Sequence, residues 1–372
     1  MKVIITMWLI LISTGLMAYE VAQYSKVFVD PLRNNRQINT VIYYPVAEDA
    51  MEEAFPYIIF GHGWIMNHSL YGTLTNNLVS MGMIMAYPRT EEGLFPDHYE
   101  FALDISFLEG ALFTENLNPD SPLFGIMEPL SIAMGHSMGG GAAVLAAAMD
   151  NGFDSLVTFA AAETSVSAIS AAQNIFIPSI TFSGSSDTIT PPAQHQLPIY
   201  NNLASDYKCY ISILGAGHLN LYNNSLIPQF LEPWLAYLRT GQISYIYAFE
   251  HVLDKNLAEI NYQVENNLVV SVDEQLVPAI QNRIFSFPNP FQTVTTFRIN
   301  PPAKSRSAIT IYNLKGQQVR TLPLADFSES GSNVKWDGTN DAGKKLPPGV
   351  YLYRWQEGGI AITGKVLMRS SR

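Results

Sequence analysis

The stretch that decides the fold is "SIAMGHSMGGGAAVLAAAM", residues Ser131 to Met149. An apolar run leads into Gly-His-Ser-Met-Gly, and a run of helix-forming alanines follows. A serine nucleophile on a sharp turn requires this order of strand, turn and helix. Because Gly135 and Gly139 carry no side chains that would collide where strand and helix approach, we expect Ser137 to project from the carboxyl edge of a sheet.

Short apolar runs alternate with helical patterns from Val41 to about Tyr237. The runs are "NTVIYYPV", "FPYIIFGHG", "MIMAYPRT", "SIAMGHS", "SLVTFAAAE", "SITFSGSSD" and "YKCYISILGAGH". Several are continuously apolar, which is typical of strands covered on both faces. Alternation of strands and helices predicts an α/β fold with a mostly parallel central sheet.

The pattern changes after this region. From Ile284 onward, short alternating runs separated by turn residues predict an all-β unit, with a tight hairpin at Lys315-Gly316. A unit of this size suits a small Ig-like sandwich. We therefore predict a catalytic domain over residues 19–240, a closing segment and linker over 241–283, and a C-terminal sandwich over 284–372.

The first residues, "MKVIITMWLILISTGLMAYE", have the build of a secretory signal peptide covering residues 1–18. Their apolar run is too short to span a bilayer, and we expect no transmembrane segment in the mature chain. Cys209 is the only cysteine, so no intrachain disulfide can form. It lies in an apolar run, and we expect it to be a buried packing residue.

Composition excludes several classes of partner. The chain of 372 residues is 48% hydrophobic and 14% charged, as in a globular protein, and its formal net charge is −11. So little basic surface argues against nucleic acid or an anionic membrane as partner. No glycine loop that would bind phosphate is present, and His62 and His68 do not form a recognised zinc pair. We expect no cofactor and no metal.

A serine nucleophile needs a base, and the base needs an acid to orient it. Among the histidines, only His218 follows the last strand of the alternating region. Asp187 also lies just past a strand, whereas its rivals Asp154 and Asp206 open or precede strands at the wrong edge. The order Ser137, Asp187, His218 is the order found in α/β-hydrolases. We expect these residues to form the catalytic triad.

The oxyanion that forms during ester cleavage needs backbone N–H donors. One should be the N–H of Met138, directly after the nucleophile. The other should come from the loop "GHGW" after an apolar strand, and we nominate Trp64, whose side chain could equally be an aromatic wall.

Residues from about Val41 to Thr240 resemble the cutinase-like and polyester-hydrolase branch of the α/β-hydrolases, whose neighbours include dienelactone-hydrolase-like and chlorophyllase-like enzymes. The resemblance rests on "GHSMGGG" and on "SSDTITPPAQHQLPIYNNL". It implies the same triad and oxyanion donors, and it places Ile189 and His195 in the substrate cleft. We expect Trp64 and His136 to contact the substrate as well.

The chain departs from this family at two points. Glu163 stands where the family carries a cleft tryptophan, which puts an aromatic polyester substrate in doubt but not ester cleavage. The family's C-terminal disulfide is absent.

The tail has its own resemblance. "FPNPF", "ITIYNLKGQQVRTL", "VKWDGTNDAGKKLPPGVYLYR" and "GKVLMR" resemble the Ig-like sorting domain of proteins exported by the type IX secretion system, and similar sandwiches occur in flagellar hook-assembly proteins. The resemblance implies secretion machinery as a partner. It also implies release from, or display on, a Gram-negative cell.

Together these features predict a secreted serine ester hydrolase that is cutinase-like, with polyesters such as PET among its candidate substrates. One alternative is a lipase or a short-chain acyl esterase on the same fold. An alternative of another class is a surface-binding protein whose hydrolase domain is inert.

Overall fold

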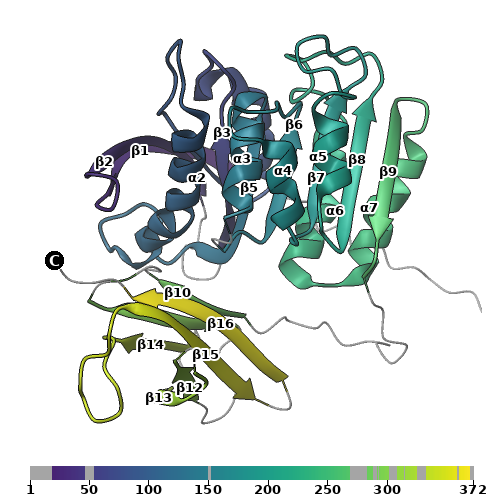
Figure 1. The fold of residues 1–372 in the computed structure, drawn as a ribbon. Coiled ribbons are helices and arrows are strands. Elements are labelled where there is room, and N and C mark those ends of the chain that lie inside the picture. The colour runs from purple at the N-terminus through teal and green to yellow at the C-terminus, as the bar shows by residue number, and fades with distance from the viewer. Residues whose placement is uncertain are drawn as a thin grey trace, which may run out of the picture.

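The computed structural model describes residues 19–46, 54–149, 152–268, 283–287, 291, 293–300, 308–313, 315–324, 332–357 and 360–368. The predicted signal peptide and most of the predicted linker lie outside the described residues. The strands and helices form one α/β unit and one all-β unit (Figure 1). Among the described residues, no helix combines the length and the apolar character needed to cross a membrane.

A sheet of nine strands forms the centre of the α/β unit, in the order β1-β2-β4-β3-β5-β6-β7-β8-β9. The strands from β4 through β8 in this order are parallel, and the pairings β1–β2, β2–β4 and β8–β9 are antiparallel. The strand bounds are β1 (Glu20–Asp30), β2 (Arg36–Val46), β3 (Phe55–Gly61), β4 (Ile84–Pro88), β5 (Met127–His136), β6 (Ser155–Phe159), β7 (Ser179–Gly184), β8 (Tyr207–Ile213) and β9 (Ile260–Asn266).

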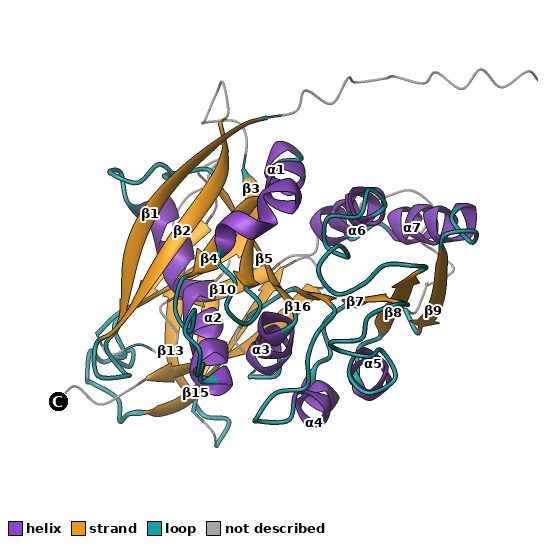
Figure 2. Cartoon of the chain, turned by 90° about the horizontal axis from the view of Figure 1, so that it is seen from above, coloured by secondary structure: helices purple, strands orange, loops and turns teal. Residues whose placement is uncertain are grey.

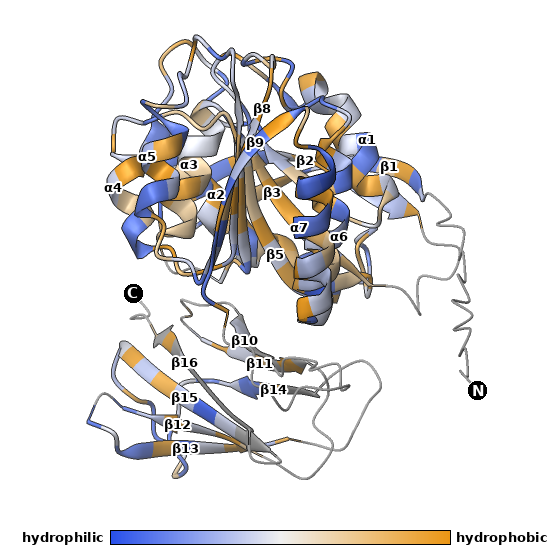
Figure 3. Ribbon diagram, turned by 90° about the vertical axis from the view of Figure 1, so that its right-hand side faces the viewer, coloured by the Kyte–Doolittle hydropathy of each residue, from blue (hydrophilic) through white to orange (hydrophobic). Residues whose placement is uncertain are grey.

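Helices cover both faces of this sheet (Figure 2). On one face lie α1 (Gly72–Ser80), α6 (Ile227–Thr240) and α7 (Ile243–Lys255), which share an apolar core with β3 to β8. On the other face lie α2 (His98–Phe113), α3 (Met138–Ala147), α4 (Ala168–Ala171) and α5 (Gln196–Asn202). Short 3₁₀ turns occur at His68–Tyr71, Thr114–Leu117 and Ala172–Asn174. The central strands are apolar because both of their faces are buried (Figure 3).

The α/β unit begins with a strand that the sequence pattern does not predict, and it extends beyond residue 240, where the predicted catalytic domain ends. At its start, β1 pairs with β2 over eleven residues each and has no counterpart among the predicted strands. At its end, α7 packs into the core through Phe249, and β9 pairs with β8 from Ile260 to Asn266. Residues 243–266, placed in the closing segment and linker, are therefore part of the central fold.

The C-terminal unit consists of two antiparallel sheets. One has the order β10-β11-β14 and the other β13-β12-β15-β16. Their strands are β10 (Arg283–Phe287), β11 (Thr295–Asn300), β12 (Ala308–Tyr312), β13 (Gln318–Pro323), β14 (Ser332–Trp336), β15 (Gly349–Glu357) and β16 (Ile360–Met368). This C-terminal unit has its own apolar core, in which Trp336 and Trp355 are buried. The expected α/β fold with a small C-terminal sandwich is confirmed, and Gly316 with φ +75° forms the expected hairpin turn between β12 and β13.

Candidate active site

Ser137 connects β5 to α3 through a backbone conformation that serine rarely adopts, with φ 55° and ψ −123°. Its N–H donates to the carbonyl of Phe159, and its own carbonyl accepts from Ala162 and Gly141. Strand β6 and the loop after it therefore hold the turn in place. A conformation of this kind costs free energy and persists only where the surroundings enforce it.

Glycines around the turn allow the strands and α3 to approach closely. A Cβ atom on Gly135 would overlap the carbonyl of Gly139, and one on Gly139 would overlap the backbone of Gly61 at the end of β3. The first turn of α3 is thus pressed against both β5 and the start of the loop after β3. The sequence predicts this role for Gly135 and Gly139, and the structure adds the backbone of Gly61 as the surface that Gly139 faces.

The three residues expected to form a triad come together at the carboxyl edge of the sheet. Ser137 Oγ lies 2.8 Å from His218 Nε2, and His218 Nδ1 lies 2.8 Å from Asp187 Oδ2. His218 follows β8 and Asp187 follows β7, so three different strand ends supply the three side chains. All three residues are buried apart from a small exposed fraction.

Asp187 is held as a carboxylate by several donors. Its Oδ1 accepts from the backbone N–H groups of Ile189 and Thr190, and its Oδ2 accepts from the Thr190 hydroxyl and from His218. Burial alone would raise the pKa of Asp187, but the hydrogen bonds from His218 and Thr190 outweigh burial and lower it. An ionised Asp187 fixes the proton of His218 on Nδ1, which leaves Nε2 free to accept the serine proton.

His136, expected to contact the substrate, has no exposed surface and cannot do so in this conformation. Its Nε2 lies 3.1 Å from the carbonyl of His218, which can only accept, so this nitrogen carries the proton. Its Nδ1 therefore accepts from the Tyr71 hydroxyl at 3.1 Å, and that hydroxyl in turn accepts from the N–H of Gly63 at 2.8 Å. Burial and the neighbouring His218 lower the pKa of His136 to about 3, so it stays neutral.

The two expected oxyanion donors lie on segments that meet near Ser137, the start of α3 and the loop after β3. Met138 is the first residue of α3, where no preceding helical turn accepts its N–H. Trp64 lies three residues beyond Gly61, which contacts the start of α3. Among the described residues, the backbone N–H of Trp64 makes no hydrogen bond. Its indole Nε1 donates to the carbonyl of Leu94 at 3.1 Å.

Ile189 and His195 lie in the loop between β7 and α5. Ile189 is largely exposed beside Asp187. His195 is partly buried, and its Nδ1 accepts from the N–H of Glu163 at 2.9 Å. Burial lowers its pKa. A neutral His195 with an accepting Nδ1 joins the loop after β6 to the loop after β7.

The chain matches the models of two known protein families. Residues 39–240 match the family model of PET hydrolase-like proteins, which is more than half of the chain. The chain belongs to the PET hydrolase-like family. It is therefore a hydrolase. A second match, over residues 291–357, is to the FlgD Ig-like domain. No curated protein matches the chain.

Glu163 marks how this PET hydrolase-like chain departs from the pattern expected of its family. Its carboxylate accepts from the N–H of Ile169 in the first turn of α4, and its own N–H donates to His195. The position is therefore occupied by an acidic residue fixed to a helix start. No aromatic side chain stands there.

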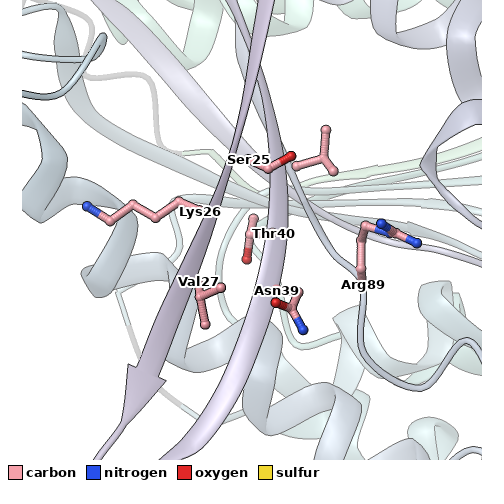
Figure 4. Close-up of a pocket in the computed structure, with 7 residues that line it drawn as sticks. Ser25, Lys26, Val27, Asn39, Thr40 and Arg89 are labelled. Carbon is pink, nitrogen blue, oxygen red and sulfur yellow. The ribbon is translucent and has the colours of Figure 1, made fainter.

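The rival acids of this PET hydrolase-like chain precede their strands, at the edge of the sheet opposite Ser137, and a pocket lies on β1 and β2. Asp154 Oδ2 accepts from the N–H of Ser131 near the amino end of β6, and Asp206 directly precedes β8. A pocket on β1 and β2 has two cations on its wall, which point in opposite directions (Figure 4). Each is already paired, Lys26 with Glu115 and Arg89 with Glu92. The pocket is lined by Ser25, Lys26, Val27, Asn39, Thr40, Val41 and Arg89.

Two residues of the site were missed by the sequence analysis. Tyr71 orients His136, and Thr190 places its hydroxyl within 3.1 Å of both the Ala160 carbonyl and His218 Nδ1. Thr190 follows Asp187 by three residues in a loop, where an Asp side chain commonly accepts from the backbone just after it, and this signal could have found it. Tyr71 carries no such local signal. No group of His, Cys, Asp and Glu suited to a metal occurs in the part of the chain that the structure describes.

Proposed function

We propose that the protein is a serine ester hydrolase that cleaves polyesters and related carboxylic esters through an acyl-enzyme. The observation that supports this most strongly is the continuous hydrogen-bonded line from Ser137 through His218 to Asp187. Family membership supports the hydrolase class and the ester or polyester substrate.

In this proposal, Ser137 Oγ attacks the ester carbonyl while His218 Nε2 takes its proton. The carbonyl oxygen becomes negative and accepts hydrogen bonds from the N–H groups of Met138 and Trp64. His218 then passes its proton to the leaving alcohol, and the acyl group remains on Ser137. A water molecule, activated by His218 in the same way, releases the acid. Asp187 stabilises the imidazolium in both halves of the reaction.

The surroundings of Ser137 support an apolar substrate. Large apolar side chains are exposed on the loops that follow β3, β4, β6, β7 and β8, which are Trp64, Ile65, Leu94, Phe95, Val166, Ile189, Leu214 and Leu219. Every one of these loops leaves the carboxyl edge of the sheet, where Ser137 lies. Apolar side chains gathered around a reactive serine favour a substrate with apolar acyl or alcohol groups.

The test of the nucleophile is Ser137→Ala, with the exposed Ser170→Ala on α4 as matched control. We expect Ser137→Ala to lower kcat/KM on p-nitrophenyl butyrate and on a polyester film by about 10⁴-fold or more. A fluorophosphonate probe should label Ser137 in the unaltered chain and in the control. Near-normal turnover in a stably folded Ser137→Ala chain would require another nucleophile. Absence of both labelling and turnover in the unaltered chain would favour an inert binding protein.

We further propose that the chain is exported to the surface or surroundings of a Gram-negative cell. The signal-like sequence over residues 1–18 and the resemblance of the tail to a type IX sorting domain support this. The match to an Ig-like domain over residues 291–357 is compatible with that role. Mass spectrometry of the protein recovered from the culture medium and from the cell surface would test it, because export predicts a chain that begins near Tyr19.

A further inference from the structure

Phe95 is the most exposed large apolar residue of the loops around Ser137. It is 96% exposed and lies in the loop 89–97 between β4 and α2, next to Leu94, which is also exposed. We call the loops 62–67, 89–97, 160–167, 185–195 and 214–226 the rim loops, because each follows a strand end at the carboxyl edge of the sheet, the upper edge in Figure 1. An aromatic side chain left in water loses the free energy that burial would give it.

Two hydrogen bonds fasten the loop 89–97 to the loop that carries the oxyanion candidate. His62 Nε2 donates to the carbonyl of Thr90 at 2.8 Å, and Trp64 Nε1 donates to the carbonyl of Leu94 at 3.1 Å. The exposed indole of Trp64 therefore lies against the backbone directly before Phe95. This contact brings the exposed side chain of Trp64 to the backbone of the loop that carries the exposed Leu94 and Phe95.

A second set of contacts, made by Glu91, also fixes the loop 89–97. Glu91 forms an ion pair with Arg36 at 2.8 Å, and its other carboxylate oxygen accepts from the N–H of Asp97 at 2.7 Å. Asp97 in turn caps the start of α2. Glu91 also has φ +58°, a strained value for a residue with a side chain. Phe95 therefore lies on a loop that is already ordered in the folded chain, so binding does not have to order it.

Further bonds continue this chain of contacts around Ser137. The N–H of Ser165 donates to His98 Nδ1 at 3.1 Å, and the N–H of Glu163 donates to His195 Nδ1 at 2.9 Å. The loop 89–97 therefore occupies the side of the site between Trp64 and the loop after β6. Glu163 lies in that next loop and offers no aromatic surface of its own.

We propose that Phe95, with Leu94 and Trp64, forms a platform that binds the uncharged apolar chain of a water-insoluble polyester beyond the ester being cleaved. The proposal rests on the proposed function, because it assigns the platform to the same site. Charge favours this occupant, since the 32 Asp and Glu side chains of the chain outnumber its 21 Lys and Arg side chains and give it a net charge of −11. These carboxylates would repel an anionic lipid surface, whereas a neutral polymer meets no such repulsion.

The test compares Phe95→Ala with Phe176→Ala. Phe176 is 69% exposed but precedes β7, at the opposite edge of the sheet, so it is a matched control. We expect Phe95→Ala to lower turnover of a polyester film by about five- to tenfold more than it lowers turnover of p-nitrophenyl butyrate. Adsorption to the film, measured in the Ser137→Ala background, should weaken by a similar factor. Phe176→Ala should leave both quantities unchanged.

Equal film turnover and adsorption for the two variants would overturn the platform. An equal loss of turnover on film and on soluble ester in Phe95→Ala would also overturn it, since Phe95 would then act on the reacting groups. A third contrary outcome is that Phe95→Ala weakens adsorption to anionic vesicles but does not weaken adsorption to the film. Failure of the proposed function gives a different result, because the unaltered chain would then cleave neither ester. The adsorption measurement in the Ser137→Ala background still decides the platform in that case.

Discussion

The hydroxyl of Tyr71 joins three parts of the site. It accepts from Gly63, beside the oxyanion loop, and donates to His136, which donates to the backbone of His218. Burial raises the pKa of Tyr71 well above its ordinary value, so the hydroxyl keeps the proton that this chain of bonds requires. Tyr71 is a positioning residue in this arrangement, since it does not touch Ser137.

Replacing Tyr71 with Phe should therefore leave a buried N–H and a buried imidazole nitrogen without partners. We expect a loss of about 1–3 kcal/mol in the free energy of unfolding. We also expect a lower kcat at unchanged KM, because the backbone of His218 loses its support. Denaturant unfolding and steady-state kinetics measure the two effects, with the exposed Tyr99→Phe as control. Wild-type stability in the Tyr71→Phe chain would contradict this account.

Glu109 makes stability depend on pH far from the catalytic residues. Its carboxyl group accepts from Tyr57 and Ser131, and burial, with Asp154 nearby, raises its pKa from 4.5 to about 8. The folded chain thus holds a proton that the unfolded chain releases above pH 4.5. The stability from this group is complete below that pH and is lost as pH rises through about 8.

Urea unfolding between about pH 5 and pH 8 should show this loss, with a slope of at most about 1.4 kcal/mol per pH unit. Glu109→Gln keeps the shape without the titrating proton, so its slope should be flatter. Glu232, exposed on α6, offers Glu232→Gln as a control. Identical slopes in all three chains would exclude Glu109 as the source.

At the scale of residues, the sequence locates Ser137, Asp187 and His218 because each follows an apolar strand in a recognisable order. It misplaces His136, because nothing local reveals that Tyr71 and the carbonyl of His218 will enclose the ring. Partners from distant strands determine that burial. Thr190 is an intermediate case. Its contact with Asp187 is local in the sequence, whereas its contacts with Ala160 and His218 are not.

At the scale of elements, strong apolar runs predict the parallel strands β3 to β8, while the antiparallel edges are harder to foresee. Strand β1 alternates exposed and half-buried residues along most of its length, so it lacks a continuous apolar signal. After the buried Ile260, the residues of β9 alternate in the same way, with Tyr262 and Val264 half-buried between exposed neighbours. Edge strands of this kind are defined by their pairing with a neighbour more than by composition.

A chain that ends at Thr240 should not fold, although the family match ends there. It lacks the buried Ile246, Phe249, Leu253 and Ile260, each of which contributes about 1.5–3 kcal/mol. Their sum is comparable with the whole stability of a typical domain, about 5–15 kcal/mol. A chain that ends at Asn282 retains them and should unfold cooperatively. Circular dichroism melting curves of both chains check this, and a stable chain ending at Thr240 would show α7 and β9 to be accessory.

At the scale of the whole molecule, the two units have separate cores. Trp336 and Trp355 belong to the core of the C-terminal sandwich, and none of the proposed catalytic residues lies in that unit. A sandwich of this size can fold on its own. The α/β unit therefore contains every group that the proposed chemistry uses.

Deleting residues after Asn282 should leave kcat/KM on p-nitrophenyl butyrate unchanged and should prevent delivery to the cell surface. Turnover of the purified chains and fractionation of the cells measure the two outcomes separately. A large loss on the soluble ester, in a truncated chain that is still folded, would show that the sandwich helps to form the site. A loss confined to insoluble polymer would give the sandwich a role in binding that surface.

The reactivity of Cys209 can report local opening of the folded chain. The thiol lies in β8 between Ile180 of β7 and Val264 of β9, has no exposed surface, and is the only cysteine of the chain. Burial raises its pKa well above the ordinary value, which suppresses the reactive thiolate. Its side chain belongs to the core between the sheet and helices α6 and α7, so a thiol reagent can reach it only when that core opens. The labelling rate, read against that of an unfolded chain, gives the free energy of that one opening without any engineered probe.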